Sequence, residues 1–165
     1  MCWFLDFVSY HSKECGFIIK EIPILHNDGE RCFNYFITGP KTFPSSLESQ
    51  TVYYQYNMQM LKWEFGDYEI NEAIIDIARK LGNDIVYLKG DEKRDFIKRI
   101  FPRPTFIELQ KLPSFRELNS CIHERCKVRH GNHCARRKVF ELRYIFHRNH
   151  LEREYGTVNY TIYKQ

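Results

Sequence analysis

The chain has 165 residues, of which 43% are hydrophobic and 16% aromatic, a composition typical of a packed globule and not of a disordered segment. No apolar run approaches the ~18 residues of a membrane-spanning helix, and the first residues lack the basic region of a secretory signal. A chain of this length can build a core without disulfide staples. We therefore expect the six cysteines to be reduced and the protein to be intracellular, either cytoplasmic or nuclear.

The net charge of +4 is concentrated near the C-terminus. Residues 1–120 hold 15 Lys and Arg against 17 Asp and Glu, whereas residues 121–165 hold 10 against 4. A basic surface formed by this second part would attract phosphate groups. The alternative is that the same cations lie on the solvated face of a helix and bind nothing.

Three strands are predicted in the first quarter of the chain, over residues 3–10, 17–25 and 32–37, because each is rich in aromatic and β-branched residues. Asn27-Asp28-Gly29 is a turn sequence that predicts a hairpin between the second and third strands. Pro23 lacks a backbone N–H group, so we expect it at a sheet edge or at a bulge.

Helices and strands alternate in the rest of the chain. A Tyr- and Met-rich run predicts a helix over residues 51–61, and regularly spaced isoleucines predict the clearest helix over residues 69–81. A buried-type strand follows over 84–89, then a charged helix over 91–100 and a short strand over 105–109.

The chain ends with a short helix predicted over 113–120 and an amphipathic helix predicted over 135–147. Three hairpin strands followed by alternating helices and strands predict an α/β fold, in which helices cover a mixed sheet of antiparallel and then parallel strands. We expect one domain over residues 1–150 and a polar C-terminal tail over 151–165.

The stretch from Cys121 to Cys134 holds three of the six cysteines and three of the seven histidines. Its tightest set is Cys126, His130 and Cys134, each four residues from the next, and a Gly-Asn pair lets the segment turn between them. Thiolate and imidazole groups are the ligands that structural zinc prefers, in sets of four. The sequence predicts a zinc loop that takes one ligand from elsewhere; the alternative is buried thiols beside solvated histidines.

Several segments resemble known nucleases. Asp6 in the first strand, residues 18–22 in the second and residues 35–40 in the third resemble the opening of proofreading-type 3′–5′ exonucleases with the DEDDh signature, which have a ribonuclease H-like fold. His133-Cys134-Ala135 resembles the late histidine of that family. The Maelstrom-type domain, a degenerate branch with a Glu-Cys-His-Cys zinc site, is more similar still, and related arthropod mobile-element-associated proteins share the patterns at 86–93 and 113–115.

The Maelstrom-type resemblance implies a specific set of zinc ligands: Glu21, Cys126, His130 and Cys134, with Cys121, His123 and His133 as alternatives within the loop. A glutamate inside an apolar strand is costly unless it has a partner, and a metal ion would supply one. The alternative is that Glu21 simply points to solvent.

The chain departs from the exonuclease pattern at its acids. The resemblance leaves Asp6 as a vestige, because the acid expected two residues later is Val8 and the acid expected five residues after the late histidine is Lys138. Two-metal hydrolysis needs several carboxylates that converge on two ions. Three further acids are available outside the motif context: Glu108, Asp91 and Asp95. The resemblance therefore implies a catalytically inactive relative.

We expect a zinc-stabilised pseudoenzyme that binds single-stranded RNA, in small-RNA or transposon silencing or in its viral suppression. Expected phosphate contacts come from the basic loop and the helix after it: Arg125, Lys127, Arg129, Arg136, Arg137 and Lys138. One alternative is an adaptor that binds a silencing-pathway protein through the same scaffold. Another is a ribonuclease with an unconventional site.

Overall fold

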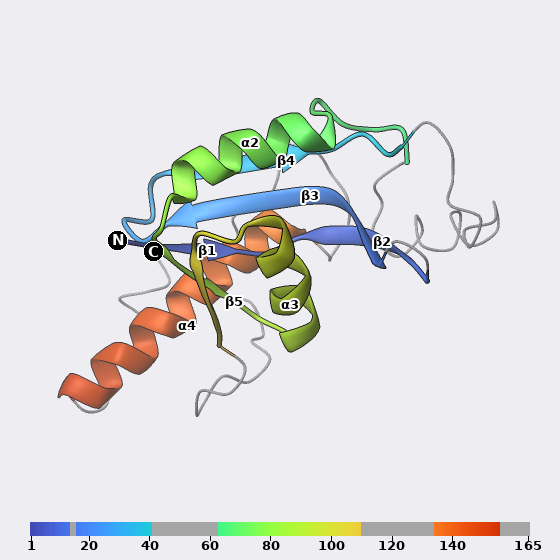
Figure 1. The fold of residues 1–165 in the computed structure, drawn as a ribbon. Coiled ribbons are helices and arrows are strands. Elements are labelled where there is room, and N and C mark those ends of the chain that lie inside the picture. Colours follow the sequence, from blue (N-terminus) through green and yellow to red (C-terminus); the bar gives the residue numbers. More distant parts are fainter. Residues whose placement is uncertain (14–15, 41–62, 110–133, 156–165) are drawn as a thin grey trace.

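The computed structural model describes residues 1–13, 16–40, 63–109 and 134–155, with side chains described as far as Asn149 in the last range. These residues form an α/β fold with one six-stranded mixed sheet and three helices (Figure 1). The α/β prediction is therefore confirmed. The helices predicted over 51–61 and 113–120 lie outside the described residues.

The antiparallel half of the sheet is built around the long strand β3 (Gly16–His26). Strands β1 (Cys2–Leu5) and β2 (Val8–Ser12) pair along one edge of β3, and β4 (Cys32–Phe36) pairs along the other. The turn between β3 and β4 contains Gly29 at φ 79°, a conformation that favours glycine, so the predicted hairpin is confirmed.

A β-bulge at Lys20 sets which side chains of β3 enter the core. Val8 pairs with Glu21 but Ser9 pairs with Ile19, so Lys20 is the extra residue on β3. Strict alternation would place Ile19 and Ile22 on opposite faces of the sheet. The bulge instead brings both into the same hydrophobic cluster.

The strand predicted over residues 3–10 is interrupted at Asp6 and Phe7, between β1 and β2. The register places this gap opposite Ile22 and Pro23 of β3. The expectation for Pro23 was wrong, because β3 is an interior strand and the bulge lies elsewhere. The interrupted ladder explains how an interior strand accommodates a residue without an N–H group.

The parallel half follows the prediction to within one residue at each end. It comprises α2 (Ile70–Leu81), β5 (Ile85–Leu88), α3 (Asp91–Ile100) and β6 (Thr105–Glu108). Because β5 runs parallel to β1 and β6 parallel to β5, the strands lie in the order β4-β3-β1-β5-β6, with β2 continuing beyond β1. The predicted parallel pairing of the 84–89 strand with the first strand is confirmed.

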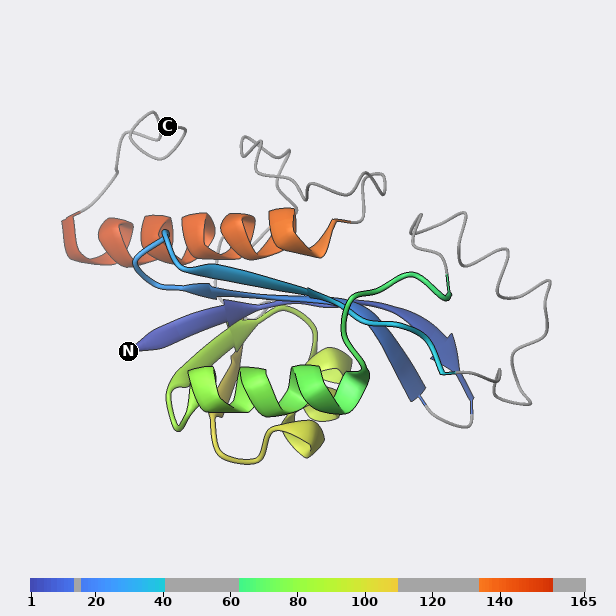
Figure 2. The same cartoon turned by 90° about the horizontal axis from the view of Figure 1, so that it is seen from above.

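The sheet separates two hydrophobic clusters. Helices α2 and α3 cover one face, and α4 (Ala135–Tyr155) covers the other (Figure 2). Along β1 the side chains alternate, so Leu5 packs in the α2/α3 cluster and Phe4 packs against α4. Helix α4 extends eight residues beyond its predicted end at 147, since no glycine or proline occurs before Gly156.

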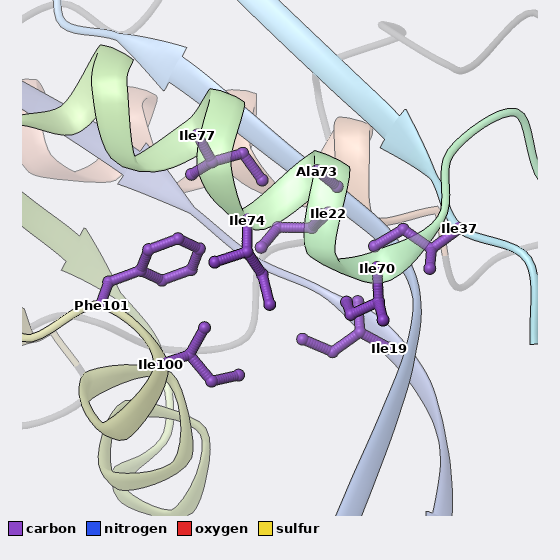
Figure 3. A pocket seen from close by; sticks show the side chains of 9 residues that line it. All are labelled: Ile19, Ile22, Ile37, Ile70, Ala73, Ile74, Ile77, Ile100 and Phe101. Atoms are coloured by element: carbon purple, nitrogen blue, oxygen red, sulfur yellow. The ribbon is translucent and has the colours of Figure 1, made fainter. Parts of the chain in front are cut away.

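A small cavity lies between α2, α3 and the sheet (Figure 3). Its volume is about 10 Å³, and its lining is entirely apolar: Ile19, Ile22, Ile37, Ile70, Ala73, Ile74, Ile77, Ile100 and Phe101. A space of this size without polar groups holds neither a ligand nor an ordered water molecule. We therefore regard it as a packing void. Among the described helices, none has the length and apolar character needed to cross a membrane.

Candidate functional site

Two buried carboxylates lie on neighbouring strands near the centre of the sheet. The exposed fractions of Asp6 and Glu21 are 8% and 0%. Glu21 pairs with Val8, two residues after Asp6, as predicted. Buried carboxylates require partners, and the two obtain them from different layers of the fold.

Asp6 is paired with Lys93. The Lys93 ammonium lies 2.8 Å from Asp6 Oδ1 and also donates a hydrogen bond of 2.8 Å to the Phe7 carbonyl. Lys93 belongs to the first turn of α3, which follows directly after β5, the parallel neighbour of β1. An ammonium group thus occupies the place beside the one acid that the exonuclease resemblance retains.

The remaining acids do not complete a carboxylate cluster with Asp6. Glu108 Oε1 accepts a hydrogen bond of 2.8 Å from the Gly90 amide. Asp91 and Asp95 are largely exposed and pair with Arg94 at 3.0 and 3.1 Å. Sequence reasoning offered these three acids as possible metal ligands, whereas the described contacts direct Asp91 and Asp95 toward Arg94.

Sequence reasoning singled out Lys138 as the cation opposing a metal ion and overlooked Lys93. Lys138 is exposed on the first turn of α4, and the described ion pair of Asp6 is with Lys93. A signal was present, because Lys93 ends the pattern at 86–93 and stands just beyond the carboxyl end of a strand predicted to lie beside the first. Residues at such strand ends converge on one edge of a parallel sheet.

Glu21 is held at the start of α4. Its Oε1 accepts a hydrogen bond of 2.7 Å from the Ala135 amide, and its Oε2 accepts one of 3.1 Å from Asn34 Nδ2. Ala135 is the first residue of α4, where a negative charge is favoured by the helix dipole and by the unpaired amides. The alternative that Glu21 points to solvent is wrong.

The structure brings together two of the four zinc ligands that the resemblance implies. Cys134 is 3% exposed and immediately precedes Ala135, the residue whose amide binds Glu21. Carboxylate oxygen and thiolate sulfur both ligate zinc, so this pair fits half of a tetrahedral set. Five further candidates lie outside the described residues: Cys121, His123, Cys126, His130 and His133. Within the described ranges, no three His, Cys, Asp or Glu residues are grouped to hold a metal.

Lys20, the bulged residue of β3, forms a buried anchor that the sequence did not reveal. Its side chain is fully buried, and the ammonium donates to three main-chain carbonyls, those of Ile37 at 2.5 Å and of Trp63 and Phe65 at 2.6 Å. Burial lowers the pKa of Lys20 to about 8, with the nearby Glu64 carboxylate acting in the opposite direction. At neutral pH the group remains the ammonium that these three acceptors require.

The basic residues of α4 differ in how they are engaged. The Arg136 guanidinium lies 5.2 Å from the centre of the Phe140 ring, and Arg137 Nε pairs with Glu141 at 3.2 Å. Lys138 is exposed. The other three predicted phosphate contacts, Arg125, Lys127 and Arg129, lie outside the described residues.

No protein-family model matches the sequence, and a search of the curated proteins finds no significant match. Function is therefore inferred from the residues of this chain and from their geometry.

Exchanging Lys93 for Met should lower the free energy of unfolding by about 1–3 kcal/mol, because it leaves the Asp6 carboxylate buried without its charged donor. Asp6→Asn should cost less in the Lys93→Met background than in the parent, since the two groups interact directly. Urea unfolding of the four proteins of this cycle measures the coupling. Lys98→Met, on the exposed side of the same helix, should change stability by less than ~0.5 kcal/mol. Strictly additive effects would show that the pair is not energetically coupled.

Proposed function

We propose that this chain is a catalytically inactive, exonuclease-like module of ribonuclease H-like fold that binds single-stranded RNA. The observation that carries the proposal is the ion pair between the Lys93 ammonium and Asp6 Oδ1. Two-metal hydrolysis needs carboxylates that converge on two ions roughly 4 Å apart. Here the one acid of the motif that persists is neutralised by a tethered cation instead.

The topology supports the fold proposed. Antiparallel hairpin strands lead into two parallel strands in the order β4-β3-β1-β5-β6, with α2 and α3 on one face and α4 on the other. The ribonuclease H-like fold has the same order of strands. In that arrangement Asp6 stands at the end of the first strand, where the resemblance places the first acid.

A structural zinc site is part of the proposal. Glu21 and Cys134 would supply two ligands at the start of α4, and Cys126 and His130 would supply the others. Zinc in such a set carries no open position for substrate, and its contribution is to hold the ligating segments together. The buried Glu21 carboxylate and the buried Cys134 thiol at one place support this assignment.

RNA would contact the basic start of α4 and the stretch before it, mainly through its phosphates. Residues 121–165 carry the whole basic excess of the chain, and Lys138 is exposed on the first turn of α4. Contacts of this kind position a strand without reading its bases. The Maelstrom-type resemblance assigns such binding to small-RNA or transposon silencing.

Changing Arg136, Arg137 and Lys138 together to Ala should weaken binding of a short labelled single-stranded RNA. The dependence of log affinity on log salt should flatten by ~0.7 for each phosphate that the variant no longer neutralises, because fewer counterions are released. Fluorescence anisotropy across a series of salt concentrations measures both effects. A charge-matched control replaces Arg79, Lys98 and Arg99, which are exposed on α2 and α3 and should leave binding unchanged. Zinc content should be the same in all three proteins.

Two results would redirect the assignment. If the parent does not bind RNA at any salt concentration, the adaptor becomes the better reading, and the existing contacts of Arg136 with Phe140 and of Arg137 with Glu141 favour it. If the parent cleaves RNA with Mg²⁺ or Mn²⁺ and Asp6→Asn abolishes cleavage, the chain is an unconventional ribonuclease.

A further inference from the structure

We propose that Asn34 is a positioning residue that fixes the Glu21 carboxylate as a zinc ligand at the start of α4. This inference rests on the zinc site of the proposed function and assigns a role to a residue on β4 that no sequence pattern marked. Asn34 pairs in register with Pro23, and Phe36 pairs with Glu21, so Asn34 and Glu21 are diagonal neighbours on adjacent strands. Their side chains meet through the 3.1 Å bond from Asn34 Nδ2 to Glu21 Oε2.

The two oxygens of the Glu21 carboxylate receive hydrogen bonds from two different elements. Oε1 accepts from the Ala135 amide of α4, and Oε2 accepts from Asn34 of β4. Two donors on separate oxygens fix the rotation of the carboxylate plane, which a single donor would leave open. Each carboxylate oxygen has two acceptor positions, so each retains a further position after these bonds are made. The carboxylate is thus oriented and still able to bind a cation next to Cys134.

Such orientation affects metal affinity. Ligating groups are ordinarily held by outer hydrogen bonds, and removing one of these typically costs about 10–100-fold in affinity. Glu21 is fully buried, so the carboxylate cannot replace a lost donor with bulk water. Loss of the Asn34 amide should therefore weaken zinc binding while the Cys and His ligands remain intact.

The test measures zinc affinity by chelator competition on the folded full-length protein. Asn34→Leu removes the donor at similar size and should lower zinc affinity about 10–100-fold. Cobalt substitution provides a second readout. The thiolate-to-cobalt band should remain, whereas the ligand-field bands should shift because the oxygen ligand is no longer fixed. Asn83→Leu, an exposed residue that bonds Arg103, is the matched control and should change neither readout. If Asn34→Leu does not fold, Asn34→Ser keeps a polar group too short to reach Glu21 and should show the same loss.

The outcomes separate this inference from the proposed zinc site. A parent protein that contains no zinc overturns both. A parent that holds one zinc ion, lost in Cys134→Ser, together with Asn34 variants of unchanged affinity and spectrum, overturns only the role of Asn34. A drop in thermal stability of the Asn34 variants with unchanged zinc affinity would show a merely structural role and would also overturn it.

Discussion

Replacing Lys20 by Met should lower the free energy of unfolding by at least about 3 kcal/mol, which is the largest effect we expect from a single substitution. The ammonium satisfies three carbonyls, those of Ile37, Trp63 and Phe65, and its side chain is fully buried. A thioether donates no hydrogen bond, so all three acceptors would lose this donor, at a cost of ~1–3 kcal/mol for each one left buried and unsatisfied. Urea or thermal unfolding measures the loss.

A local readout distinguishes this effect from general destabilisation. Gly39 and Thr38 donate their amides to the Trp63 and Tyr68 carbonyls, in the same region that Lys20 anchors. Hydrogen exchange at these amides should accelerate in Lys20→Met more than exchange in β5 does. Lys13→Met, an exposed lysine next to the same hairpin, is the matched control and should change stability by less than ~0.5 kcal/mol. Equal stability of the two variants would refute the anchoring role.

Removing zinc should be the second large effect. In the proposed site, binding free energy is folding free energy, because the ligands converge only in the folded chain. At a free zinc concentration a thousand times the dissociation constant, the site would contribute about 4 kcal/mol, and a strong chelator should abolish that contribution. Elemental analysis should find one zinc ion per chain, and unfolding with and without chelator measures the energy.

Cys134→Ser provides the control for chelation. It removes a proposed ligand, so its stability should match that of the chelated parent and should not respond further to chelator. The prediction fails if protein purified without chelator contains no zinc, or if the variant and the parent respond equally. The Lys20 result is independent of this outcome, since its partners are main-chain carbonyls.

Several elements follow from local sequence alone. The helix over 70–81 was predictable because Ile70, Ile77 and Leu81 recur on one face and Gly82 ends it, and the structure places Ile77 and Leu81 in the core. Helix α3 begins and ends where its charged, amphipathic pattern does. Residues of one element carry these signals, so no knowledge of the rest of the chain is needed. The polar end of α4 was missed because its last turns lack an apolar stripe.

The candidate site was only partly readable. Asp6, Glu21 and Cys134 were singled out as residues, and the structure confirms that Asp6 and Glu21 lie on neighbouring strands. Their partners were not predictable, because Lys93 and Ala135 are separated from them by 87 and 114 positions in the chain. No local pattern specifies which of many lysines or amides reaches a given carboxylate.

Composition and periodicity determined the α/β class, the places of most strands and helices, and the presence of acids that need partners. Tertiary structure alone decided the bulge at Lys20, the cation that neutralises Asp6 and the seating of α4 on Glu21. The physical reason is the range of the interactions involved. Secondary structure depends on neighbours within a few residues, whereas a buried charge is compensated by whichever distant group the packing of the sheet brings within hydrogen-bond distance.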